Sequence, residues 1–236
     1  RGMNLSSMDL SSMTSSRITL RAIAILCASF SVSALAADID DFYGTTEPFA
    51  SEAIYFVMTD RFVNGDPSND HRDQGGTDPA LRTFDRPVPD ANGDNIGYLG
   101  GDFKGIVDNA GYIRGMGFTS VWVTPIVDNP DQAFTGGSPI GSDAFFKDQG
   151  KTGYHGYWGT SFYKLDEHLP SAGLDFAGFT RAMKDKQLDV VLDIVGNHGS
   201  PAYSMPKLQP QYGKVYDRDG ELIADHQNLD PAKLDP

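Results

Sequence analysis

Cysteine is almost absent from this chain: its 236 residues include one, Cys27. A single cysteine has no partner within the chain, so a disulfide framework is excluded. Cys27 also lies inside an N-terminal segment that we expect to be removed, which leaves the mature chain without cysteine. The mature protein must then be held together by a large apolar core, by bound ions, or by both.

The N-terminal region also lacks a hydrophobic run long enough for a membrane anchor. Its apolar run, Ala22–Phe30, follows Arg17 and Arg21 and is too short to span a bilayer. The small residues of Ala34–Ala36 then offer a cleavage site. This pattern predicts a signal peptide over residues 1–36, with an over-extended start, and a secreted protein, extracellular or periplasmic.

Basic residues are few. Lysine and arginine number 19 against 32 aspartates and glutamates, which gives a net charge of −13. This charge argues against nucleic acid or an anionic membrane surface as a partner, and it suits a neutral ligand or bound cations. The roughly 200 residues after the signal peptide are enough for one substantial domain, which we expect to be a monomer.

Three β-rich runs are present, at residues 53–58, 118–124 and 189–195. The third is apolar at nearly every position, which predicts a strand buried on both faces. Long loops, expected to be irregular, follow the first two strands over 63–101 and 128–169. In a barrel, loops that follow strand ends carry the functional residues.

Two segments between these runs, 103–116 and 174–187, have apolar residues at helical spacing. The expected apolar face of the first helix consists of Ile106, Ala110, Ile113 and Met116. The order strand, helix, strand, helix, strand predicts an α/β fold with parallel strands. A barrel and a doubly wound sheet share this order, so periodicity alone leaves both open.

The polar residues after the third strand indicate a family. Asp193, Asn197 and His198 form Asp-x-x-x-Asn-His, which resembles the first sequence signature of the α-amylase family of glycoside hydrolases. Four further stretches resemble the family in the same order, and the last of them is similar to the cyclodextrin-forming and bacterial amylase branch. These stretches are 54–62, 117–125, 154–158 and 197–202.

The resemblance implies a (β/α)8 TIM barrel. Residues 37–198 are expected to supply its first three strands, and 199–236 the start of the domain inserted after the third strand. We therefore expect the chain to be an amino-terminal fragment of a longer precursor, poorly folded and inactive by itself.

The stretch 154–158 has residue types that suit a sugar. Aromatic rings can stack on the apolar face of a pyranose, and imidazoles can form hydrogen bonds with its hydroxyl groups. The resemblance implies substrate contacts for His155, Tyr157 and His198, and the same loop offers Trp158. The alternative is that these aromatic side chains only pack between loops.

A second cluster has the oxygen ligands that Ca²⁺ prefers. The resemblance implies a calcium loop made by Asn64, Asp66, Asn69, Asp70, the carbonyl of Gly100 and Asp102. It also implies a separate structural calcium held by Asn197, between the barrel and the inserted domain. A solvated turn rich in Asn, Asp and Gly is the alternative for the loop.

Catalytic carboxylates are not assignable. Retaining glycosidases need a nucleophile and a general acid/base, and the resemblance places both after the fourth and fifth strands, beyond Pro236. Asp193 is expected to hold an arginine of the neighbouring strand, and Asp60 and Arg61 to be structural. The acidic residues of the C-terminal tail, expected to be irregular, receive no role: Asp217, Asp219, Asp225, Asp230 and Asp235.

These features predict a secreted α-glucan hydrolase that cleaves α-1,4 links of starch or maltooligosaccharides from within the chain by a retaining mechanism, with Ca²⁺ as cofactor. A cyclodextrin-forming or other glucosyl transferase of the same family is one alternative. A non-catalytic carbohydrate-binding scaffold is the other.

Overall fold

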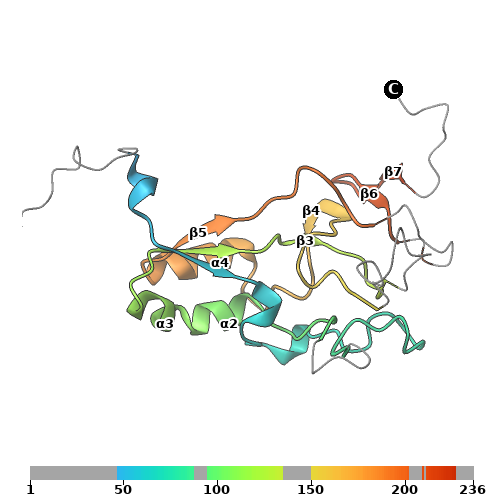
Figure 1. Ribbon diagram of the computed structural model, residues 1–236, viewed down its shortest axis with the longest axis horizontal. Coiled ribbons are helices and arrows are strands. Elements are labelled where there is room, and N and C mark those ends of the chain that lie inside the picture. Colours follow the sequence, from blue (N-terminus) through green and yellow to red (C-terminus); the bar gives the residue numbers. More distant parts are fainter. Residues whose placement is uncertain (1–46, 88–94, 135–149, 202–208, 210, 227–236) are drawn as a thin grey trace, which may run out of the picture. The chain divides into compact units, whose positions relative to one another are not determined.

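The computed structural model describes residues 47–87, 95–134, 150–201, 209 and 211–226 (Figure 1). The predicted signal peptide and Cys27 lie outside the described residues. The chain divides into two compact units, Arg1–Ser51 and Glu52–Pro236. The described part of the first unit contains a short 3-10 helix, η3 (Pro48–Ser51).

The second unit contains a three-stranded parallel sheet. It consists of β1 (Ile54–Val57), β2 (Ser120–Val123) and β5 (Asp189–Leu192), in the order β1-β2-β5 (Figure 1). The last residue of each strand is paired with the last residue of its neighbour. The three predicted strands are therefore confirmed, and their carboxyl ends lie together at one edge of the sheet.

Three short helices pack against this sheet: α2 (Phe103–Asp108), α3 (Ala110–Gly115) and α4 (Phe176–Asp185). Their apolar side chains and those of the strands form one core. Its fully buried members include Phe103, Ile106, Ala110, Ile113, Val121, Val123, Phe179, Met183 and Leu188. The side-chain carboxylates of Asp102 and Asp175 cap α2 and α4 by accepting a backbone N–H from the first turn.

The single helix expected over 103–116 is wrong in two details. It divides at Asn109, whose side-chain amide donates to the Gly105 carbonyl at 2.8 Å and whose backbone leaves the helical region. Met116 is 44% exposed rather than part of the core, because α3 ends at Gly115 and Gly117 turns the chain with a positive φ of 96°.

The expectation that the third strand is buried on both faces is also wrong. Among the described residues β5 pairs only with β2, so it is an edge strand. Leu192 and Ile194 are 36% and 79% exposed. The face of the sheet that carries Phe56 and Trp122 is exposed as well. The two rings meet there edge to face, with centroids 5.8 Å apart.

A second sheet lies in regions that were expected to be irregular. It contains β3 (Val127–Asp128), β4 (Ser161–Leu165), β6 (Lys214–Tyr216) and β7 (Leu222–Asp225), in that order. The expectations of an irregular loop over 128–169 and of an irregular tail are therefore wrong. No described helix is both long enough and apolar enough to cross a bilayer.

Three aspartates of the tail belong to the β6–β7 hairpin: Asp217, Asp219 and Asp225. The Asp217 carboxylate accepts the backbone N–H groups of Asp219 and Glu221 in the turn, and Asp225 ends β7. Asp217 therefore has a structural task that explains its presence. Asp230 and Asp235 lie outside the described residues.

Candidate functional site

The candidate site begins where β1 ends, in the 3-10 turn η4 (Thr59–Arg61). Asp60 is buried, accepts the backbone N–H groups of Leu99 and Gly100 at 3.0 Å, and forms an ion pair with Arg61. Burial raises the pKa of Asp60 to about 6, although Arg61 opposes this shift. The Arg61 guanidinium lies over the Tyr154 ring, 3.6 Å from its centroid. Asp60 and Arg61 thus join the end of β1 to the loop 154–158.

His155 and Tyr157 are brought together inside that loop. The His155 Nδ1 accepts the Tyr157 backbone N–H at 3.0 Å, and the two rings stack with centroids 5.7 Å apart. The Trp158 ring meets His155 edge to face at 4.9 Å. Burial lowers the pKa of His155 to about 4, and the charges of Lys151 and Arg61 act in the same direction. A neutral His155 that accepts at Nδ1 carries its proton on Nε2 and can donate it.

Tyr157 also connects the loop to the third strand. Its hydroxyl donates to the Asp193 Oδ2 at 2.7 Å, and Asp193 directly follows β5. Burial and this carboxylate raise the pKa of Tyr157 to about 12. Asp193 therefore has a tyrosine partner here, whereas its expected role as an arginine ligand stays a prediction.

His198 and Asn197 follow the same strand and are exposed. Their side chains contact one another, with Asn197 Nδ2 3.3 Å from His198 Nδ1. The charge of His198 is the smallest of the causes that lower the pKa of His155, after burial and the charges of Lys151 and Arg61. The predicted role of Asn197 as a calcium ligand stays a prediction.

The predicted calcium loop packs against the N-terminus of α2. The Asp102 carboxylate accepts the backbone N–H groups of Gly65 at 3.2 Å, Asp66 at 2.8 Å and Gly105 at 2.6 Å. It also accepts the Asn69 side-chain amide at 3.2 Å. The loop and the helix are thus tied together by one buried carboxylate.

The other predicted ligands gather around Gly100. Asn64 Nδ2 donates to Asp70 Oδ1 at 2.6 Å. Gly100 has a φ of +85°, and a Cβ there would lie 2.3 Å from Asn64 Nδ2 and 2.4 Å from Asp70 Oδ1. Only glycine allows its backbone to approach these side chains so closely.

Two amide oxygens in this loop suit a cation. Asn64 Oδ1 and Asn69 Oδ1 are buried and have no hydrogen-bond partner among the described residues. Buried acceptors without donors are rare, and a hard cation is one partner that would satisfy them. In the described part of the chain no three His, Cys, Asp or Glu side chains form a metal-binding group, so a site here needs amide and carbonyl oxygens in addition to carboxylates.

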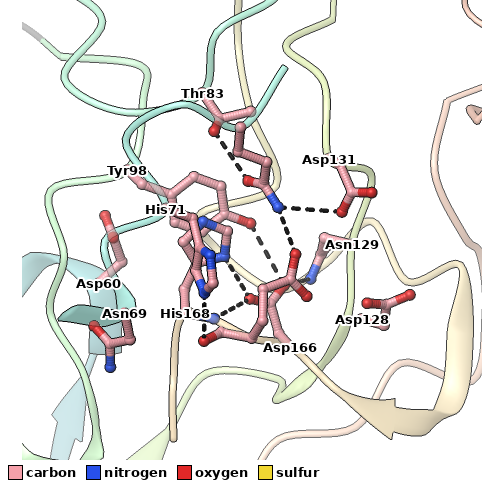
Figure 2. A network of polar contacts seen from close by, with 12 residues as sticks. Asp60, Asn69, His71, Thr83, Tyr98, Asp128, Asn129, Asp131, Asp166 and His168 are labelled. Carbon is pink, nitrogen blue, oxygen red and sulfur yellow. Dashed lines mark hydrogen bonds and ion pairs between the residues drawn. The ribbon is translucent and has the colours of Figure 1, made fainter. Parts of the chain in front are cut away.

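The sequence did not predict a buried polar network that contacts the loop 154–158 and is drawn in part in Figure 2. Asn129 Oδ1 accepts the Trp158 backbone N–H at 3.0 Å, while its Nδ2 donates to Asp166 Oδ2 at 3.2 Å. The second Asp166 oxygen lies 2.8 Å from His168 Nδ1. These are single polar residues beside the short strands β3 and β4, where no periodic pattern marks them.

Acidic residues extend the network outward. Gln74 Nε2 donates to Asp131 Oδ1 at 3.1 Å and also to Glu167 (Figure 2). Burial raises the pKa of Asp131 to about 6, and the nearby charge of Glu167 adds to the shift. This part of the network joins the loop after β3 to the long loop before α2.

Known proteins are similar to this chain in sequence. A family model described as the α-amylase catalytic domain matches residues 56–219. The cyclomaltodextrin glucanotransferase of Klebsiella oxytoca is 35% identical over 181 residues, which cover 75% of this chain and 23% of that protein. The α-amylase of Niallia circulans is 33% identical over 74% of this chain and 29% of that protein.

A solved structure is similar as well. A cyclomaltodextrin glucanotransferase with a three-domain ABC distribution aligns with a TM-score of 0.56 and 35% identity, covering 75% of this chain and 32% of that chain. The chain thus spans a third or less of the length of these similar proteins.

Proposed function

The chain belongs to the family of α-amylase catalytic domains, a TIM-barrel fold matched here over part of the chain, and on that premise we propose that it acts on α-glucans. The reaction we favour is retaining, endo-acting hydrolysis of α-1,4 links in starch-like polymers after secretion. The loop cluster of His155, Tyr157 and Trp158, at the carboxyl edge of the parallel sheet, is the observation that supports it.

The cluster can bind and orient one sugar ring. Neutral His155 offers its Nε2–H to a hydroxyl oxygen, and it keeps this protonation state over the whole range above its pKa of about 4. The aromatic faces of Tyr157 and Trp158 suit the apolar face of a pyranose. Because Asp193 holds the Tyr157 hydroxyl, the ring is oriented before a sugar arrives.

The bond-breaking carboxyl pair receives no assignment. A retaining glycosidase uses two carboxyl groups about 5–5.5 Å apart. Near the loop, Asp193 is engaged by Tyr157, and Asp60 is buried and paired with Arg61. We therefore give neither of them the role of nucleophile.

Calcium, when bound, would supply structural cross-linking through Asn64, Asp66, Asn69, Asp70, the Gly100 carbonyl and Asp102. The buried amide oxygens of Asn64 and Asn69 support this proposal. Asp102 already ties the loop to α2, and Gly100 is bound to Asp60 at the end of β1. A cation here would hold β1 and the first helix together without touching the sugar.

A glucosyl transferase is the second candidate. Cyclomaltodextrin glucanotransferases occur among the similar proteins, with identities as high as those of the α-amylases. A transferase differs from a hydrolase in the acceptor that resolves the covalent intermediate, a sugar hydroxyl instead of water. The loop cluster would bind the donor sugar in either case.

Calorimetric titration of the full chain with maltoheptaose tests the binding part of the proposal. We expect Tyr157→Ala and Trp158→Ala to weaken binding at least tenfold, because each removes a stacking surface. Tyr163→Ala is the matched control, since Tyr163 is 71% exposed on β4 and lies outside the cluster. Equal losses in all three variants, or no binding by the unmodified chain, would contradict the proposed site.

Product analysis with a protein that contains the complete catalytic domain, including the expected carboxyl pair, separates the reactions. Linear maltooligosaccharides with new reducing ends, released first as the α-anomer, would support retaining hydrolysis. Cyclic products without new reducing ends would support the transferase. Binding with neither product would favour the non-catalytic carbohydrate-binding alternative.

A further inference from the structure

His168 is a buried group with no task in the proposed function. It follows β4 and is 2% exposed, and the Tyr98 ring stacks on it with centroids 3.8 Å apart and planes 10° apart (Figure 2). Its Nδ1 is bound to Asp166 at 2.8 Å. Its Nε2 is buried and has no hydrogen-bond partner among the described residues.

A small pocket lies beside this imidazole. Its polar lining includes Asp60, Tyr98, Thr124, Asn129, Asp166 and His168. The pocket has a volume of about 10 Å³ for the centre of a water molecule, which corresponds to a single water. A water molecule needs two to four polar partners to remain ordered, and this lining offers them.

Below its pKa, His168 carries a proton on each ring nitrogen, so that Nδ1 donates to Asp166 and Nε2 is a second donor. Burial alone would lower the pKa of His168, but the charge and hydrogen bond of Asp166 outweigh it and raise the pKa. Asp166 remains a carboxylate for the same reason, because His168 lowers its pKa against the effect of burial. An imidazolium in this place has an N–H on Nε2 that must find an acceptor.

Acceptors line the same pocket. The Asp60 carboxylate is one of them, and its charge and that of His168 act on each other. Tyr98 Oη is another, because a hydroxyl that donates to Asp166, here at 3.5 Å, can still accept through its oxygen lone pairs.

We propose that one ordered water molecule occupies this pocket, accepts the Nε2–H of His168 and donates to the Asp60 carboxylate. The water completes a hydrogen-bonded chain from the end of β1 to the loop 154–158. From His168 the chain passes to Asp166 at 2.8 Å, to Asn129 at 3.2 Å and to the Trp158 N–H at 3.0 Å. The water is thus a structural ligand that helps to position the loop, whatever that loop binds.

A crystal structure of the full chain at a resolution that reveals ordered waters is the direct test. We expect one electron-density peak within hydrogen-bond distance of both His168 Nε2 and an Asp60 carboxylate oxygen. In solution, we expect the His168 Nε2–H to give a nuclear Overhauser cross-peak to a long-lived water. An empty pocket, a direct bond from Nε2 to a protein oxygen, or a cation on a deprotonated Nε2 would each overturn the proposal.

His168→Phe separates the water from the packing of the ring. Phenylalanine can keep the stack on Tyr98 but offers no N–H, so we expect the density peak to disappear. His226→Phe is the control, because His226 is exposed at the end of the β6–β7 hairpin, and there the peak should remain. A water that persists in His168→Phe would show that His168 does not hold it. If that variant does not fold, the density and cross-peak of the unmodified chain still decide.

Discussion

The half-buried His155 of the loop 154–158 gives a quantitative test of the site. His155 has an ordinary pKa of 6.5 in the unfolded chain and a pKa of about 4 in the folded protein, chiefly because it is buried. Between these two pH values the unfolded chain binds a proton that the folded protein does not. His155 therefore leaves stability unchanged above pH 6.5 and lowers it progressively as the pH falls toward 4.

The magnitude follows from the size of the shift. At about 1.4 kcal/mol per pH unit, the full effect of His155 on the free energy of unfolding is about 3 kcal/mol, and about 2.5 kcal/mol of it is lost by pH 4.5. Asp60 and Asp131 act in the opposite direction, because their pKa values are raised to about 6 and their folded forms gain stability as the pH falls. A single pH profile would therefore show partial cancellation.

A matched variant removes this cancellation. Urea unfolding of the unmodified chain and of His155→Gln at pH 7.5 and 4.5 gives a difference in which the aspartate terms drop out. We expect the unmodified chain to lose about 2–3 kcal/mol more than the variant between these two pH values. Parallel losses in the two proteins would mean that His155 titrates normally when folded, and the reasoning about a neutral donor in the loop would fail.

Three further predictions concern the core, the calcium loop and a tight contact. Phe179→Ala should lower the free energy of unfolding, measured by urea unfolding, by about 3–5 kcal/mol, because Phe179 is fully buried. The control Tyr112→Ala, at a position that is 61% exposed, should change it by less than about 0.5 kcal/mol. Gly105→Ala should destabilise by at least about 1–3 kcal/mol in the same assay, since its Cβ would lie 1.8 Å from the Val63 carbonyl oxygen. Calcium at 100 times its Kd should stabilise the chain by about 2.7 kcal/mol relative to chelator, and Asp102→Ala should abolish this gain; an unchanged calcium response in that variant would remove Asp102 from the site.

The alternating strands and helices of the first sheet could be predicted from sequence because their patterns are local. Each strand is a short apolar run, and each helix places apolar residues on one side. The pattern indicates only that the residues are hydrophobic, however, and does not indicate whether another strand or helix packs against them. This is why β5 was expected to be buried on both faces, whereas Ile194 beyond its end is 79% exposed.

The second sheet could not be predicted because its pairings are distant and its strands short. β3 has two residues and pairs with β4, so that Val127 lies opposite Leu165, and β4 pairs with β6 through Ser161 and Tyr216. Strands of two or three residues are too short to show an alternating pattern. The pairings of β3 with β4 and of β4 with β6 join segments far apart in the chain, which no local window contains, whereas the β6–β7 hairpin is local.

The candidate site was predicted only where a motif marked it. The motif residue Tyr157 contacts Asp193 directly after β5, whereas the contacts of His155, Tyr157 and His198 with a sugar stay a prediction. Asn129 and Asp166 hold the same loop in place, yet they stand alone among loop residues and belong to no periodic pattern. Such residues can be identified only from the structure, because their hydrogen-bond partners lie far away in the sequence.

The predicted calcium loop and the loop 154–158 are both connected to the end of β1. Parallel strands bring their carboxyl ends to the same edge, and the loop that follows β1 reaches both sites from there. Asp60 connects the two sites. Its carboxylate accepts the Gly100 N–H beside the predicted calcium loop, and its ion-pair partner Arg61 lies over Tyr154 in the loop 154–158. A cation that fixes Gly100 therefore also restricts Asp60 and Arg61. Coupling between two sites is reciprocal, so a sugar that orders Tyr154 should raise the affinity for calcium by the factor by which calcium raises the affinity for sugar.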